Sequence, residues 1–153
     1  MKKLFLLLSL LYFSCFNPLF SATVIHAGLL INGESSFPTP EMSIVIEGSK
    51  IQAIETGYIT PDSEDDFIDL SGYTVLPGLM DMHVHLSSEY SKNSYQERIS
   101  LNAGDYAIRA VSNAEKTLMA GFTSVRNLGD SGGVSISLRN AIKKGIVIGP
   151  RIF

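Results

Sequence analysis

The sequence predicts an α/β protein in which a small β module precedes the first strands of a (β/α)8 barrel. Residues 23–72 contain short runs of β-branched and aliphatic residues between turn residues, with no helical periodicity. Residues 73–153 instead alternate strand-like and helix-like segments, which is typical of parallel βαβ units. A complete barrel needs about 250 residues. We therefore expect a truncated barrel of two to three strands.

The first 22 residues indicate an export signal. Lys2 and Lys3 precede an apolar run, and Ser21-Ala22 provides small residues for cleavage. The run is too short for a membrane span, which needs about 20 apolar residues. We expect a periplasmic or secreted protein with no stable membrane span. The alternative is a lipid anchor at Cys15, the single cysteine.

The expected β module contains four short strands. They lie at residues 23–31, 43–47, 50–54 and 67–70. The segments that separate them carry turn or loop residues, namely Asn32-Gly33, Pro38 and Pro40, Gly48-Ser49, the polar residues 57–66, and a turn at Ser71-Gly72. His26 lies in this module, and we assign it a structural role.

The expected barrel part begins after Pro77-Gly78. Its elements follow one another as a strand at 79–86, a helix at 95–119, a strand at 122–126, a helix at 134–144 and a strand from 146. The first strand is apolar enough for burial on both faces of a parallel sheet. An alanine-rich stripe on the first helix would face that sheet. Asp130 or Ser131 is placed to cap the second helix.

Two histidines end the first barrel strand. Side chains alternate along a strand, so the imidazoles of His83 and His85 are expected on one face and Val84 on the other. Barrel active sites lie at this end of the strands, and two convergent imidazoles form half of a zinc site. Asp81 would share their face and orient an imidazole. The alternative is an interface or pH-sensing role for the histidine pair.

Three segments resemble one known family. The run Val75 to Leu86 (VLPGLMDMHVHL) resembles the signature that opens the barrel in the amidohydrolase superfamily. Residues 121–130 (GFTSVRNLGD) resemble the second-strand motif of its Xaa-Pro dipeptidase and imidazolonepropionase-like branch, and residues 149–152 resemble the start of the third strand. The β module matches as well, since in this family it forms a composite sandwich with a later segment.

This resemblance implies a metal-dependent hydrolase of carbon–nitrogen bonds in amides or peptides. Xaa-Pro dipeptides are among the substrates that the resemblance implies. His83 and His85 would bind one of one or two divalent metal ions, with zinc favoured, and the metal would activate water. The family's other catalytic groups lie on later strands, so we expect them beyond Phe153. The chain by itself is then expected to be an inactive part of the enzyme.

Two polar residues follow the second barrel strand. Arg126 is a candidate for binding a substrate carboxylate, because guanidinium groups bind carboxylates in a bidentate manner, and Asp130 lies at the same mouth. The structural alternative is a salt bridge for Arg126 and a helix cap for Asp130.

The expected partner is a small molecule or dipeptide. The formal net charge of −3 argues against a nucleic acid, which would require a basic surface. Two other functions remain open. One is an exported, non-catalytic module that binds metal or a partner. The other is one half of a split enzyme, which would associate through open barrel edges.

Overall fold

The computed structural model describes residues 21–130 and 132–153. The chain divides into two compact units, one that ends at Leu76 and one that comprises Pro77–Phe153. Residues 1–20 of the predicted export signal, including Cys15, and the predicted cap residue Ser131 lie outside the described residues. Among the described residues, no helix is long and apolar enough to cross a membrane.

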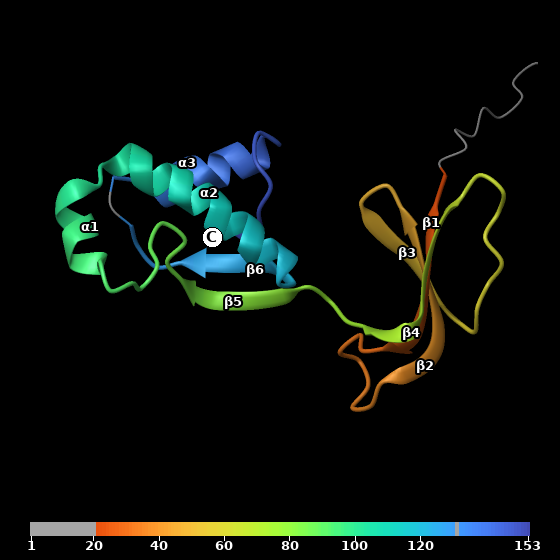
Figure 1. Cartoon of the computed structure of the whole chain (residues 1–153). Helices are drawn as coiled ribbons and strands as arrows, with labels where there is room; N and C mark the ends of the chain where they lie inside the picture. Colours follow the sequence, from red (N-terminus) through yellow and green to blue (C-terminus); the bar gives the residue numbers. More distant parts are fainter. Residues whose placement is uncertain (1–20, 131) are drawn as a thin grey trace, which may run out of the picture. The chain divides into compact units, whose positions relative to one another are not determined.

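The first unit is a four-stranded sheet (Figure 1). Its strands are β1 (Thr23–Leu30), β2 (Thr39–Glu47), β3 (Lys50–Thr56) and β4 (Asp66–Val75), in the order β3-β2-β1-β4. β1 pairs antiparallel with β2 and parallel with β4. The predicted hairpin joins β2 to β3, and Gly48 adopts the positive φ of 60° that its turn requires.

Apolar side chains of β1 and β2 form the core of this unit, namely Ala27, Leu30, Met42 and Ile44. His26 has a structural role, as expected. Its Nε2 lies 2.8 Å from the carbonyl oxygen of Ile59, and its ring stacks on Tyr58. These contacts attach the connection between β3 and β4 to the sheet.

Two predictions for this unit are wrong. Pro40 lies within β2 rather than in a loop. The β2–β3 pairing begins only at Met42, so Pro40 sits where β2 has β1 alone as a neighbour and the missing N–H costs no β3 bond. Ser71-Gly72 is not a turn that ends a strand, because β4 continues to Val75. The irregularity is a register shift against β1 between Ala27 and Leu29.

The second unit is a parallel sheet with helices on one face (Figure 1). Its elements are β5 (Leu79–Val84), α1 (Ser94–Ser100), α2 (Ala103–Met119), β6 (Phe122–Asn127), α3 (Val134–Lys143) and β7 (Arg151–Ile152). The strand order is β5-β6-β7 with parallel pairing throughout. The predicted alternation of strands and helices is therefore confirmed.

A core between the helices and the sheet stabilises this unit. It contains the buried side chains of Leu86, Ala110, Ala114, Val125, Val134, Leu138 and Ile152. The predicted alanine stripe provides its centre, since Ala110 and Ala114 have no exposed surface. Small side chains there let α2 pack close to β6 and α3.

Three predictions for this unit are wrong. The predicted helix at 95–119 is two helices, because Asn102 begins α2 with a capping box completed by Asp105. The last strand is short: residues 146–150 are irregular, and Pro150 has no N–H for a ladder. The first strand ends at Val84 and is not buried on both faces, since Met80 is 71% and Met82 56% exposed.

Candidate functional site

The candidate site lies at the carboxyl ends of β5 and β6. His83 lies in β5 and His85 follows its last residue, Val84. The two imidazole ring centroids are 5.3 Å apart, with the ring planes at 66°. The expected proximity of the two rings is therefore present, while Val84 packs against the helix-side core. Both histidines are exposed, so their nitrogen atoms are accessible to a ligand.

Asp81 lies in β5 beside an irregularity of the sheet and contacts the backbone of His83. The pairing of β5 with β6 shifts register between Asp81 and Val84, so side chains do not alternate strictly across this bulge. The Asp81 carboxylate accepts a 2.9 Å hydrogen bond from the backbone N–H of His83. Asp81 also lines a hollow of about 400 Å³ with residues of α2. Its described hydrogen bond therefore supports the backbone of His83 rather than an imidazole.

His85 contacts the loop that follows β6. Its Nδ1 lies 3.2 Å from the carbonyl oxygen of Gly129. The side-chain amide of Asn127, the last residue of β6, donates to the same oxygen at 3.3 Å. The loops after the first two parallel strands are thus joined at the histidine.

Two asparagines hold the residue that follows His85. The amide oxygen of Asn127 accepts from the backbone N–H of Leu86 at 2.9 Å. The amide nitrogen of Asn113, in α2, donates to the carbonyl oxygen of Leu86, also at 2.9 Å. The sequence reasoning missed both asparagines. Asn127 lies within the motif at residues 121–130, but its contacts and those of Asn113 join residues 41 and 27 positions apart, which the sequence does not reveal.

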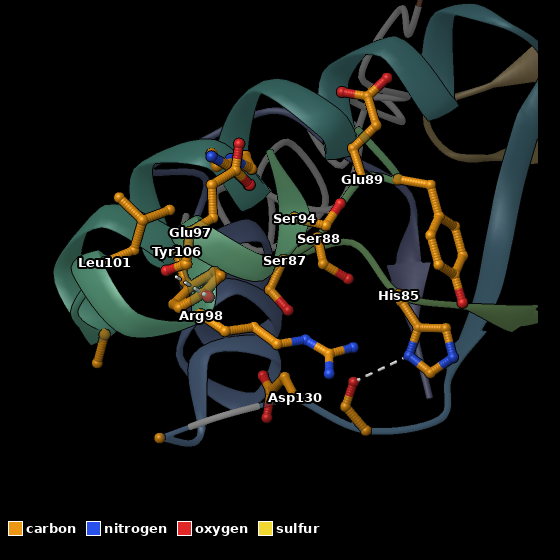
Figure 2. Close-up of a pocket in the computed structure, with 15 residues that line it drawn as sticks. His85, Ser87, Ser88, Glu89, Ser94, Glu97, Arg98, Leu101, Tyr106 and Asp130 are labelled. Carbon is orange, nitrogen blue, oxygen red and sulfur yellow. Dashed lines mark hydrogen bonds and ion pairs between the residues drawn. The ribbon is translucent and has the colours of Figure 1, made fainter. Parts of the chain in front are cut away.

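A cavity of about 910 Å³ opens beside His85 (Figure 2). Its walls come from the loop after β5, from α1, from the start of α2 and from the loop after β6. The polar and charged residues in these walls are His85, Ser87, Ser88, Glu89, Tyr90, Ser94, Glu97, Arg98, Tyr106, Arg109 and Asp130. The volume is in the range of small-molecule sites.

Two arginines of this cavity differ in their contacts. Arg109 forms an ion pair with Glu97 at 2.7 Å, and this hydrogen bond raises the pKa of Arg109 above its ordinary value. Arg98 has no carboxylate within ion-pair distance among the described residues. Figure 2 shows its guanidinium group extending into the cavity, toward the side where His85 and Asp130 lie. Sequence reasoning missed Arg98 because nothing local marks it.

Arg126 and Asp130 do not come together as a substrate-binding pair. Arg126 donates from Nε to the carbonyl oxygen of Met82 at 3.0 Å and does not line the cavity. Asp130 does line the cavity, but its Oδ2 accepts from the backbone N–H of Ser135 in the first turn of α3. Asp130 therefore binds a first-turn N–H of α3, although the N-cap residue of α3 is Gly133. Arg126 contacts a backbone carbonyl oxygen instead of the carboxylate that a salt bridge would require.

The donor set fits half of a metal site. Two imidazoles are typical ligands of zinc, which binds four ligands in structural sites and three plus water in catalytic ones. Within residues 21–130 and 132–153, no group of three or more His, Cys, Asp or Glu side chains converges as a metal site would require. His83 and His85 could therefore supply two ligands, and further ligands are needed for tight binding.

Comparisons with known proteins show what this chain is similar to. The model of the amidohydrolase family matches residues 74–153. The chain is also similar to a dihydroorotase of Syntrophus aciditrophicus (strain SB), with 29% identity over 85 residues. That match covers 56% of this chain and 17% of the relative.

Solved structures match both units of the chain. A crystal structure of a Xaa-Pro dipeptidase with methionine bound in the active site has a TM-score of 0.82 and 50% identity, covering 87% of this chain and 32% of that one. A prolidase complexed with N-methylphosphonate-L-proline has a TM-score of 0.72 and 32% identity, covering 87% and 31%. The chain thus spans about a third of the length of these solved relatives.

Proposed function

The chain belongs to the amidohydrolase family, and we propose that the whole protein is a metal-dependent hydrolase of carbon–nitrogen bonds that acts on Xaa-Pro dipeptides. The observation that carries this proposal is the paired imidazoles of His83 and His85 at the carboxyl end of the first parallel strand, beside a cavity of about 910 Å³. The dipeptide class is supported by the 50% identity to a Xaa-Pro dipeptidase.

His83 and His85 would hold the metal in this proposal. When bound, a divalent ion supplies Lewis-acid activation of water and of the scissile carbonyl. Imidazole donors suit zinc, although they also suit other transition metals. The two ring centroids lie 5.3 Å apart, and the Asp81 carboxylate accepts a hydrogen bond from the backbone N–H of His83.

The cavity beside His85 would hold the substrate. A dipeptide carries a free carboxylate, and the guanidinium group of Arg98, which lines the cavity, would bind it. Arg109 is less suited to this task because Glu97 already neutralises it. Serine and tyrosine side chains on the same walls provide further hydrogen-bond partners.

Removal of each histidine tests the metal assignment. Loss of one imidazole should weaken zinc binding by at least the 10–100-fold range known for losses of outer-sphere partners. His83→Ala and His85→Ala should each show this loss in zinc titrations of the chain, and each should abolish metal-dependent dipeptide hydrolysis by the whole protein. His26→Ala is the matched control, because its imidazole belongs to the first unit and bonds to Ile59. Unchanged zinc affinity in both site variants would refute the assignment.

A further inference from the structure

We propose that Asn127 is a positioning residue that fixes His85 as the Nδ1–H tautomer and thereby presents its Nε2 to the metal. The inference rests on the proposed function in one respect only, that His85 is a metal ligand. The tautomer itself and its dependence on Asn127 are properties of the chain without metal, so they are measured separately.

The tautomer follows from the partner of His85. A carbonyl oxygen can only accept hydrogen bonds, so the 3.2 Å contact between Nδ1 and the Gly129 oxygen requires the proton on Nδ1. In a neutral imidazole, Nε2 then carries the lone pair. Metal-binding histidines commonly have this arrangement, with the second ring nitrogen donating to a carbonyl or carboxylate.

The Gly129 carbonyl oxygen accepts a second hydrogen bond, which comes from Asn127. Gly129 has a φ of 134°, which only glycine adopts readily, and it lies in the exposed loop after β6. Asn127 donates from its amide nitrogen to this oxygen at 3.3 Å. The same oxygen therefore accepts from both Asn127 and His85, and the asparagine helps to keep it directed at the imidazole.

Asn127 also contacts the backbone of the residue that follows His85. Its amide oxygen accepts from the N–H of Leu86, the next residue along the chain, at 2.9 Å. Leu86 is 4% exposed and lies in the core, so this peptide has a fixed place. One side chain therefore constrains the backbone beside His85 and the acceptor of its ring proton. An aliphatic side chain at position 127 would lose both contacts.

Imidazole nitrogen resonances test this directly. Two-bond proton–nitrogen NMR spectra distinguish protonated from unprotonated ring nitrogens. The metal-free chain is measured at about pH 8.5, where a histidine of ordinary pKa is neutral. We expect His85 to carry its proton on Nδ1 in the unaltered chain, and to shift toward the Nε2–H form in Asn127→Ala. Zinc affinity should fall about 10–100-fold in the same variant.

Two further variants separate positioning from general loss of stability. Asn102→Ala also removes an asparagine that accepts from backbone N–H groups in this unit, but Asn102 caps α2 and has no contact with His85. It should lower stability and leave the tautomer and zinc affinity unchanged. Asn127→Asp keeps an acceptor for Leu86 and loses the donor to Gly129, so it should fold and show a smaller tautomer shift than Asn127→Ala.

The proposal is overturned by either of two results. One is an Nε2–H tautomer of His85 in the unaltered chain. The other is an unchanged tautomer in both Asn127 variants. A third result separates the two proposals. If His83→Ala and His85→Ala leave the zinc affinity unchanged while the tautomer of His85 depends on Asn127, the proposed metal site is wrong and the hydrogen-bond assignment is correct.

Discussion

The arginines of the second unit differ in what their guanidinium groups contact, and this difference assigns them different roles. Glu97 pairs with Arg109, the Met82 carbonyl accepts from Arg126, and Arg98 extends into the cavity. A guanidinium that is already paired gains less from a substrate carboxylate than one without a carboxylate partner, because the existing contact must be given up. Arg98 is therefore the better candidate for binding the substrate carboxylate.

Paired substitutions test this assignment in the whole protein. Hydrogen bonds to charged groups contribute about 1.5–3 kcal/mol, so Arg98→Ala should raise KM for a Xaa-Pro dipeptide by roughly tenfold to a hundredfold. Arg126→Ala should leave KM within about twofold and lower stability by about 1 kcal/mol, because it loses a backbone contact. Steady-state kinetics decide the matter. A raised KM in Arg126→Ala alone would restore the role first expected for Arg126.

At the scale of elements, β1 and β4 approach each other closely at a glycine. A Cβ atom on Gly28 would clash with the carbonyl oxygen of Ser71 and lie 3.1 Å from that of Tyr73. Backbone atoms cannot rotate away as side chains do, so the strands would have to separate. The register shift between Ala27 and Leu29 lies at this point.

Gly28→Ala should therefore destabilise the first unit. Overpacking typically costs about 1–3 kcal/mol, and denaturant unfolding of the chain should reveal a loss of this size. Gly72→Ala is the matched control. No atom lies within 4 Å of its added Cβ and its φ is not positive, so its free energy of unfolding should stay nearly constant. Equal losses in the two variants would show that the close approach does not limit stability.

These elements also show which parts of the fold a sequence can predict. β1, the hairpin at Gly48 and β6 are marked by local residue patterns, and all three were located within a few residues. The turn expected at Ser71-Gly72 was wrong because a glycine pattern cannot distinguish a turn from a shift in pairing with a distant strand. The break before α2 had a local signal, Asn102 with Asp105, which the prediction of one helix at 95–119 did not use.

The candidate site, like the fold, was predictable only where neighbouring residues in the sequence form it. The paired imidazoles follow from residue spacing on one strand, so sequence reasoning found them. Asn127 and Arg98 become relevant only when β6 and α1 are placed beside the loop after β5, which no spacing reveals. The β5 bulge likewise depends on pairing with β6, so the sequence alone does not reveal it.

At the scale of the whole molecule, the number of metal ligands among the described residues limits the zinc affinity of the proposed site. Catalytic zinc sites use three protein ligands and a water molecule. In the proposed site His83 and His85 would provide two, and the described residues contain no convergent group of three His, Cys, Asp or Glu side chains. The solved relatives are about three times the length that this chain spans. Under the proposed function, the remaining ligands would come from a part that corresponds to the two-thirds of these relatives outside the match.

Zinc binding with and without that remaining part tests this division. The 153-residue chain should bind zinc weakly, through two imidazoles, and should not hydrolyse a Xaa-Pro dipeptide. Addition of a polypeptide that corresponds to the other two-thirds of the Xaa-Pro dipeptidase relative should tighten zinc binding and start turnover. His85→Ala should prevent both gains, because the added ligands would then lack a partner from β5. Tight zinc binding by the chain alone would instead indicate a complete metal site within these residues.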